Sequence, residues 1–207
     1  MSKTFGLKKD KIALVIVDLQ NDFVRQGAPM LVEEAHGTIP ANQKLLAFAR
    51  ENGIPVIFTK FISSKTPNLL WNWSAEIESD HNCIRGFKRY YPDIGKAEQC
   101  TEVIDELQPI LPEDYVIEKY NYSSFRNTNL SDVLRSEGRD TIIVTGTVTQ
   151  VCVEDTVHDG FAEGFQVVLV SDCVSTWDPL QQQATLENAA NKYGMVMSSE
   201  ELLNRLG

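Results

Sequence analysis

Three residues whose side chains could share one reaction each follow a predicted strand. Asp18 and Lys119 come directly after apolar runs, and Cys152 follows another such run by a short turn. Ligands of open α/β sheets bind at the carboxyl ends of the strands, so we expect these three side chains to meet at one edge. Taken singly they have ordinary explanations: a turn carboxylate, a surface lysine and a packed cysteine. Together they are the groups that acyl transfer to sulfur needs.

The surroundings of Cys152 favour a reactive thiol. The run from Thr145 to Cys152 joins a buried strand to a helix that we predict to begin at the cysteine. A thiol in the first turn of a helix lies near the positive end of the dipole and near unpaired N–H groups, which favour the nucleophilic thiolate. Lys119 would lower the pKa of the thiol further, and Asp18 could carry protons. Backbone N–H groups at this junction could bind an oxyanion.

The elements that must position these residues alternate between strands and helices. Strands are predicted at 12–17, 54–59, 114–118, 141–145, 165–170 and 195–197, and helices at 40–52, 100–107, 129–136, 152–163, 178–193 and from 198 onward. The stretch 63–100 has weaker periodicity, and we expect an excursion over the sheet that includes short helices. No repeat or linker divides the chain. The order predicts one α/β domain over 1–207 with a mostly parallel sheet and helices on both faces.

Composition and charge exclude several classes of protein. The chain has 207 residues and is 43% hydrophobic, enough for one substantial core. No run approaches the roughly 20 apolar residues of a membrane-spanning helix, and no signal peptide is recognisable, so we expect a cytoplasmic protein. The net charge of −10 disfavours nucleic acids as partners. Neither a P-loop nor a G-x-G-x-x-G motif follows the first strand, which argues against nucleotide binding.

The cysteines allow a second interpretation of Cys152. Cys83, Cys100, Cys152 and Cys173 form no C-x-x-C pair, and we expect them to be free thiols. A redox sensor or a non-catalytic protein could use Cys152 as a reactive thiol, with Cys173 as the candidate resolving partner. The presence of both Asp18 and Lys119 argues against a sensor, because a sensor needs no carboxylate to move protons.

Three separated segments resemble the isochorismatase-like superfamily of cysteine hydrolases. They are IVDLQNDF at Ile16–Phe23, EKYNYSSF at Glu118–Phe125 and VTGTVTQVCVEDTVHDGF at Val144–Phe161. Their order, spacing and predicted strand contexts extend over roughly residues 10 to 197. The resemblance implies a three-layer α-β-α fold with a six-stranded, mostly parallel sheet. It also implies similar oligomers, a homodimer or homotetramer, for which the region of Trp71 and Trp73 is a candidate contact surface.

The same resemblance implies roles for individual residues. Asp18 would be the general base and acid, Lys119 the charge that stabilises the thiolate, and Cys152 the nucleophile. Similar enzymes have a non-proline cis peptide before the cysteine, here Thr147–Val148, which aims the amides of Val148 and Cys152 at the oxyanion.

Two aromatic residues and several basic ones are candidates for binding the substrate. Phe23 and Tyr122 match positions that line the pocket in similar enzymes. A carboxylate on the substrate could be bound by one of four basic residues, and the sequence does not choose among them. These residues are Arg85, Lys88, Arg89 and Arg126.

Departures from the superfamily patterns select among its branches. True isochorismatases lack the cysteine, so Cys152 argues against vinyl-ether cleavage. Nicotinamidases hold a metal with an Asp-x-His pair and a further His, whereas 59–65 has no such pair and His81 stands alone. The segments look most like those of ureidoacrylate, biuret and N-carbamoylsarcosine hydrolases, in that order. We therefore predict a hydrolase that cleaves a C–N bond of a small amide, ureido or N-carbamoyl compound, without metal or cofactor.

Overall fold

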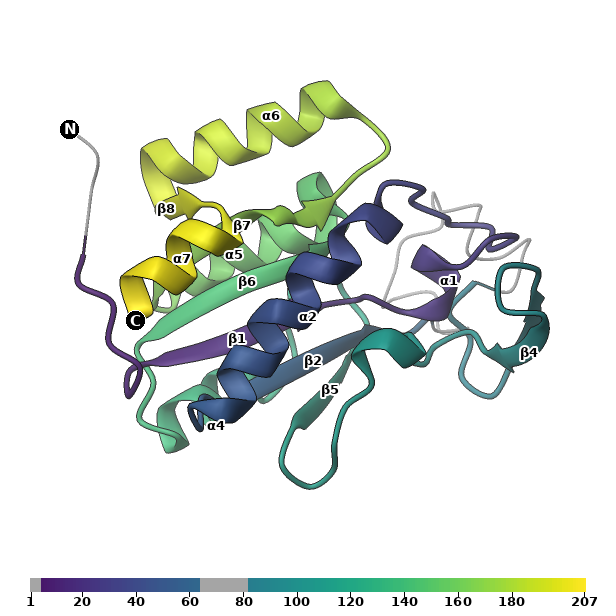
Figure 1. Cartoon of the computed structure of the whole chain (residues 1–207), viewed down its shortest axis with the longest axis horizontal. Helices are drawn as coiled ribbons and strands as arrows, with labels where there is room; N and C mark the ends of the chain where they lie inside the picture. The colour runs from purple at the N-terminus through teal and green to yellow at the C-terminus, as the bar shows by residue number, and fades with distance from the viewer. Residues whose placement is uncertain (1–4, 64–81) are drawn as a thin grey trace.

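Six strands form one parallel sheet at the centre of the computed structural model, which describes residues 5–63 and 82–207. The strand order is β5-β2-β1-β6-β7-β8, and every neighbouring pair is parallel (Figure 1). The strands are β1 (Ile12–Val17), β2 (Val56–Phe61), β5 (Tyr115–Lys119), β6 (Thr141–Thr147), β7 (Gln166–Ser175) and β8 (Gly194–Met197). This confirms the predicted α/β class and the six-stranded parallel sheet.

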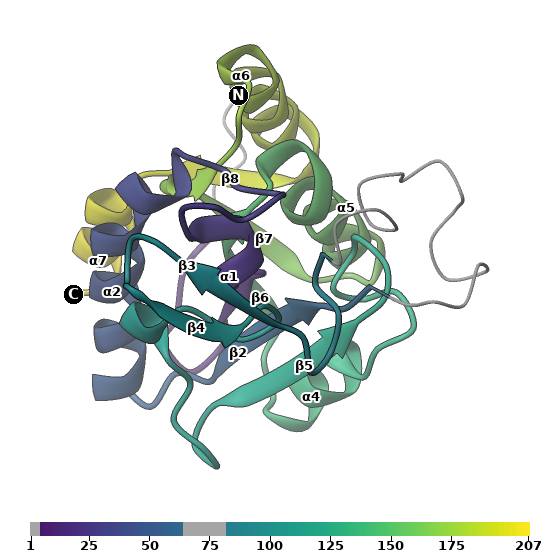
Figure 2. The same cartoon turned by 90° about the vertical axis from the view of Figure 1, so that its right-hand side faces the viewer.

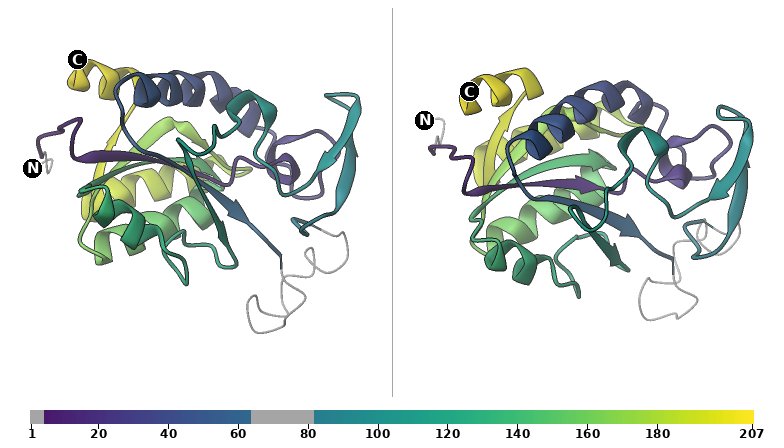
Figure 3. Two further views of the ribbon diagram at one scale, coloured as in Figure 1. Left: turned by 90° about the horizontal axis from the view of Figure 1, so that it is seen from below. Right: turned by 60° about the horizontal axis from the view of Figure 1, so that its bottom comes forward.

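Helices cover both faces of the sheet. α2 (Ala35–Glu51) and α7 (Ser199–Leu206) lie on one side, and α4 (Leu130–Ser136) and α5 (Glu154–Ala162) lie on the other (Figure 3). α6 (Pro179–Asn188) packs near the start of α5 and against β7. The arrangement is the predicted three-layer architecture.

The central strand β1 shows why a continuous apolar run was required. Its alternate side chains pack into different layers: Ile12, Leu14 and Ile16 contact the side of α2 and α7, and Ala13, Val15 and Val17 contact the side of α4 and α5. All six are buried. A parallel strand covered on both faces has no solvent side, so it carries no alternation of polar and apolar residues.

The prediction of a helix over 100–107 was wrong. Only a short 3₁₀ turn, η1 (Asp105–Leu107), forms there. The carbonyls of Cys100 and Glu102 instead accept hydrogen bonds from the amides of the short helix α1 (Asn21–Val24), at 3.1 and 2.9 Å. Because these carbonyls are occupied by another segment, they are not available to an α-helical ladder.

The described part of the excursion after β2, residues 82–100, contains a hairpin that the sequence did not predict. In this hairpin, β3 (Lys88–Tyr91) pairs antiparallel with β4 (Lys96–Gln99). Figure 2 looks onto the end of the molecule where this hairpin and α1 lie together. Trp71, Trp73 and His81 fall outside the described residues.

Two helices differ from their predicted bounds. α2 begins at Ala35, so Pro40 lies inside it instead of near its start and removes one backbone hydrogen bond. The helix predicted over 178–193 is α6 followed by a π-turn, η3 (Ala189–Tyr193). Across the described residues, no helix has the length and apolarity needed to cross a membrane.

Candidate active site

The three residues singled out from the sequence meet at the carboxyl ends of the strands. Asp18 follows β1, Lys119 ends β5, and Cys152 follows β6. The order β5-β2-β1-β6 leaves β2 between Lys119 and Asp18, so the lysine reaches across the end of β2. Its Nζ lies 2.6 Å from Asp18 Oδ2, and both side chains are 0% exposed. Cys152 is 3% exposed, so the whole trio is buried.

A sharp turn of the backbone directs Asp18 into the site. Its φ of 51° lies in the left-handed region, which a non-glycine residue seldom adopts. The hydroxyl of Thr59, on β2, donates a hydrogen bond of 2.7 Å to Asp18 Oδ1. Thr59 and Lys119 therefore hold the two carboxylate oxygens from different strands.

The approach of β6 to β1 beside Asp18 requires glycine. Gly146 pairs with Val17 at a φ of 111°. A Cβ at this position would lie 2.0 Å from the carbonyl oxygen of Val17. The chain therefore has no side chain at this close approach, which lies just before Asp18 on β1 and just before the Cys152 turn on β6.

Lys119 is charged in spite of its burial. Burial opposes the ammonium, but the interactions of Lys119 with its partners, the Asp18 carboxylate above all, outweigh burial and raise its pKa above the ordinary value. Its Nζ donates to the carbonyls of Asn121 and Tyr122, at 3.2 and 2.7 Å. These contacts hold the ammonium in the site between the carboxylate and the loop that follows β5.

The pKa of Cys152 is raised, contrary to our prediction of a thiolate. Burial is the largest cause, the charge of Asp18 adds to it, and the attraction of Lys119 only partly opposes them. Both charges lie close enough to act on the thiol. The turn also differs from the prediction: Cys152 lies in a π-turn, η2 (Thr149–Val153), and α5 begins only at Glu154. Burial therefore favours the neutral thiol form of Cys152 in the free protein.

The π-turn uses some of the N–H groups that we expected to be unpaired. The amides of Val151 and Val153 both donate to the carbonyl of Val148, at 3.1 and 3.2 Å. The peptide bond Thr147–Val148 is cis. No described residue accepts a hydrogen bond from the amide of Val148, so this N–H remains available at the start of the turn.

Phe23 and Tyr122 both lie near a third aromatic ring, Phe61, that the sequence reasoning missed. The ring of Phe61 is 6.3 Å from that of Phe23 and 6.4 Å from that of Tyr122. Lys119 Nζ lies 5.4 Å from its centroid. Phe61 was missed because the predicted strand ended at 59, whereas β2 continues to Phe61. Phe61 therefore connects the two predicted aromatic residues with Lys119 of the trio.

Two polar residues of the site were also missed. The sequence analysis took Thr59 only as the last residue of a strand. Its position at the carboxyl end of that strand is the same signal that selected Asp18, and it could have identified Thr59 as well. Gln20 is fully buried. Its side chain accepts from the amide of Phe61 at 2.7 Å and donates to the same residue's carbonyl at 3.0 Å. It thus fixes the backbone that carries the central ring.

Two of the four basic candidates already have acidic partners. Arg89 Nε donates to Asp22 Oδ1 at 2.9 Å. Arg85 pairs with Glu118 and donates to the Tyr120 hydroxyl at 3.0 Å. These contacts hold the hairpin segment against α1 and β5, so they explain both arginines as structural.

The other two basic candidates are exposed. Lys88 begins β3, and Arg126 follows the Tyr122 loop. Among the described residues, the side chain of Arg126 has no hydrogen-bond or ion-pair partner. Throughout the residues that the structure describes, no group of three or more His, Cys, Asp or Glu side chains is arranged to hold a metal ion.

The cysteines are free and buried, and their positions bear on the sensor interpretation. Cys173 packs in the layer of α2 and α7, whereas Cys152 packs in the layer of α4 and α5. The two thiols therefore lie on opposite sides of the sheet, which argues against Cys173 as a resolving partner. Burial raises the pKa of Cys83 well above its ordinary value, and Cys83 packs in the same layer as Cys173.

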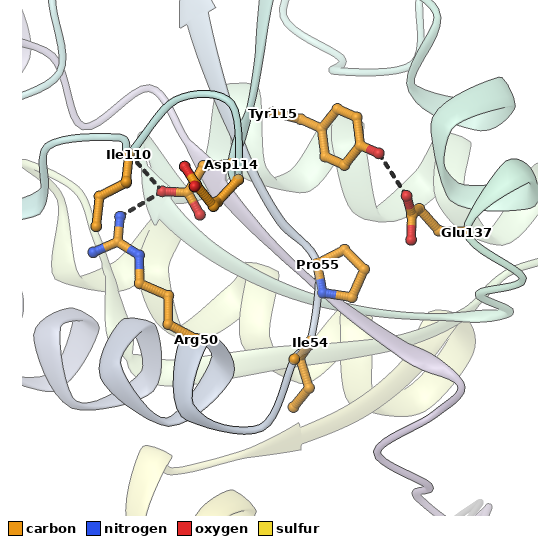
Figure 4. Close-up of a pocket in the computed structure, with 9 residues that line it drawn as sticks. Arg50, Ile54, Pro55, Ile110, Asp114, Tyr115 and Glu137 are labelled. Atoms are coloured by element: carbon orange, nitrogen blue, oxygen red, sulfur yellow. Dashed lines mark hydrogen bonds and ion pairs between the residues drawn. The ribbon is translucent and has the colours of Figure 1, made fainter.

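A separate cavity lies at the other end of the sheet. It is formed where β2 and β5 begin, and ion pairs and hydrogen bonds between its own side chains, such as Arg50 with Asp114 and Tyr115 with Glu137, cross it (Figure 4). Tyr115 starts β5 and Lys119 ends it, so the length of the strand separates this cavity from the trio.

The fold and the site together define an α/β protein with a buried Asp–Lys–Cys trio at the carboxyl ends of a parallel sheet. The isochorismatase domain family matches residues 12–201, and the chain belongs to this family. The ureidoacrylate amidohydrolase RutB of Pseudomonas syringae pv. syringae is 32% identical over 212 residues, which cover 94% of this chain and 83% of that protein.

Solved structures agree with this assignment. A cysteine hydrolase from Pseudomonas syringae pv. phaseolicola 1448A has a TM-score of 0.87 at 27% identity and covers 99% of this chain and 96% of its own. The N-carbamoylsarcosine amidase of Thermoplasma acidophilum has a TM-score of 0.75 at 28% identity and covers 92% and 97%. The predicted resemblance to the isochorismatase-like superfamily is confirmed.

Proposed function

We propose that this protein hydrolyses a C–N bond of a small amide, ureido or N-carbamoyl compound through a thioester on Cys152. The observation that carries the proposal is the buried pair of Asp18 and Lys119, whose charges both act on the thiol. Relatives named as ureidoacrylate amidohydrolase and N-carbamoylsarcosine amidase support the choice of bond and substrate class.

The first half of the proposed reaction forms the thioester. Asp18 accepts the proton of the Cys152 thiol as the sulfur attacks the planar carbonyl carbon. Because burial raises the pKa of the thiol, this proton transfer accompanies the attack rather than preceding it. The amides of Val148 and Cys152 bind the oxyanion. When the C–N bond breaks, Asp18 gives its proton to the leaving nitrogen, and ammonia or an amine departs.

The second half returns the enzyme to its starting state. Asp18 accepts a proton from water, and the resulting hydroxide equivalent attacks the thioester carbonyl. The C–S bond breaks, the acid product leaves, and the proton on Asp18 returns to sulfur. Lys119 remains charged throughout and balances the negative charge that moves between carboxylate and sulfur. General acid–base catalysis of this kind contributes about 10²–10⁴-fold to the rate.

A panel of substrates with matched variants tests the proposal. Ammonia release would be followed with ureidoacrylate analogues, biuret, N-carbamoyl amino acids, maleamate and nicotinamide. Turnover is expected for a ureido or N-carbamoyl compound and should vanish in Cys152→Ala. Cys173→Ala is the matched control, since it removes a buried thiol on the opposite side of the sheet and should keep kcat. Turnover that survives Cys152→Ala would refute the mechanism.

The proposal extends to assembly and location. We propose a homodimer or homotetramer, which the exposure of large apolar side chains supports: Trp177 is 55% and Leu180 78% exposed. Light scattering would measure the mass in solution. A mechanism that uses a reduced thiol fits the cytoplasm, where thiols stay reduced, and localisation of a tagged protein would test this.

A further inference from the structure

A second buried carboxylate near the trio has no part in the proposed reaction. Asp22 is fully buried and accepts three hydrogen bonds from the excursion that follows β2. Its Oδ1 accepts from Arg89 Nε at 2.9 Å and from the Tyr91 hydroxyl at 2.8 Å, and its Oδ2 accepts from the amide of Cys83 at 2.9 Å. A carboxylate this deeply buried is retained only where such donors compensate it.

The contacts of Asp22 lead directly to Lys119. The carbonyl of Cys83 accepts from the amide of Ser63 at 2.9 Å, and the amide of the preceding residue, Ile62, donates to the carbonyl of Lys119 at 2.9 Å. A continuous run of hydrogen bonds and backbone therefore joins Asp22, Cys83, the end of β2 and Lys119. Cys83 adopts a φ of 49°, which a non-glycine residue seldom adopts without support from its neighbours.

The other end of this run leads to Asp18. Asp22 is four residues beyond Asp18 in the chain. Between them Gln20 is bonded to both the amide and the carbonyl of Phe61. The segment from Asp18 to Asp22 is thus fixed to the end of β2 at two points, once through Gln20 and once through Asp22 and Cys83. Both attachments adjoin the segments that carry Asp18 and Lys119, the two charged residues that act on the Cys152 thiol.

We propose that Asp22 is a positioning residue for the hydrolase reaction, which holds Cys83 and the end of β2 so that Lys119 and Asp18 stay aligned on Cys152. The inference rests on the proposed function. This role differs from a general contribution to stability, because the contacts of Asp22 hold the one segment that joins Cys83 to the end of β2 and to Lys119. A displacement of about 1 Å at a reacting group can cost about 10²-fold in rate.

The variant Asp22→Asn tests this role, because it keeps the shape but replaces one acceptor oxygen by a donor. We expect kcat to fall about 10- to 100-fold with a much smaller change in KM. Glu106→Gln is the matched control: it weakens the ion pair of 2.5 Å between Glu106 and Arg25, which also joins the α1 region to a neighbouring segment but lies outside the Asp22 contacts. It should lower stability and leave kcat unchanged.

Hydrogen exchange provides a readout that needs no substrate. In Asp22→Asn, the amides of Ile62, Ser63 and Cys83 should exchange faster, whereas those of the central strands β1 and β6 should not. If the native chain shows no Cys152-dependent turnover, the proposed function fails, and the exchange data still decide whether Asp22 holds this segment. Unchanged exchange, unchanged kcat, or an equal loss of kcat in Glu106→Gln would overturn the inference.

A milder variant covers the case in which Asp22→Asn does not fold. Tyr91→Phe removes one of the three donors and leaves the ion pair with Arg89 and the bond to Cys83. We expect a fall in kcat of roughly 3- to 10-fold, since one neutral hydrogen bond to the carboxylate is lost. A wild-type kcat in this variant, with the same exchange rates, would count against Asp22 as a positioning residue.

Discussion

Removing the charge of Lys119 should destabilise the protein more than removing both charges of its ion pair. Lys119→Met removes the ammonium that compensates the buried charge of Asp18 and leaves the Thr59 hydroxyl as a neutral donor to it. Breaking a buried pair by removing one partner costs about 3–5 kcal/mol, because the remaining charge is uncompensated. The double variant Asp18→Asn/Lys119→Met has no such charge. Its main loss is the two hydrogen bonds to the carbonyls of Asn121 and Tyr122, about 1–3 kcal/mol together.

Urea unfolding followed by circular dichroism would measure both variants. We expect the double variant to be more stable than Lys119→Met by about 2 kcal/mol, although neither should turn over substrate. Lys44→Met, at an exposed position, is the control and should change the free energy of unfolding little. A double variant that is no more stable than Lys119→Met would refute the reasoning, since it would mean that removing the ammonium does not leave a costly uncompensated charge on Asp18.

The remaining predictions concern the thiol, a hydrogen bond and a glycine. Because burial raises the pKa of Cys152, its alkylation by iodoacetamide should accelerate about tenfold per pH unit above neutrality, and a plateau between pH 5 and 7 would contradict this. Thr59→Val removes the hydrogen bond of 2.7 Å to Asp18, so it should lower the free energy of unfolding by about 1.5–3 kcal/mol and also lower kcat. Thr59→Ser keeps the hydroxyl and should leave the stability and kcat unchanged in the same denaturation and rate measurements. Gly146→Ala would place a Cβ 2.0 Å from the carbonyl of Val17, so thermal unfolding should show a lower midpoint or no folded protein, and a native midpoint would be inconsistent with this geometry.

The central part of the fold could be predicted because its determinants are local. Buried parallel strands leave continuous apolar runs, and the run before Asp18 matches β1 residue for residue. The order of elements then defines the carboxyl edge of the sheet. That edge brought Asp18, Lys119 and Cys152 together, although they are far apart in the sequence.

The failures occurred where distant segments decide local structure. The stretch 100–107 has a helical pattern, yet its carbonyls are occupied by α1, which lies far from it in the sequence. The pKa of Cys152 depends on how completely the thiol is buried, and motif spacing does not report burial. Phe61 escaped notice because β-strand ends are set by pairing, here with Lys119 on β5, rather than by the strand's own residues.

The position of β1 at the centre of the sheet has a consequence for biosynthesis. β1 pairs with β6, so Ile12 meets Thr141 only after most of the chain has left the ribosome. Until then a run of six apolar residues has no partner on that side, and contacts of such long sequence separation form slowly. The nascent chain should therefore depend on chaperones that bind apolar segments. Since the three site residues come from three strands, enzymatic activity would appear only when the last of these pairings is complete.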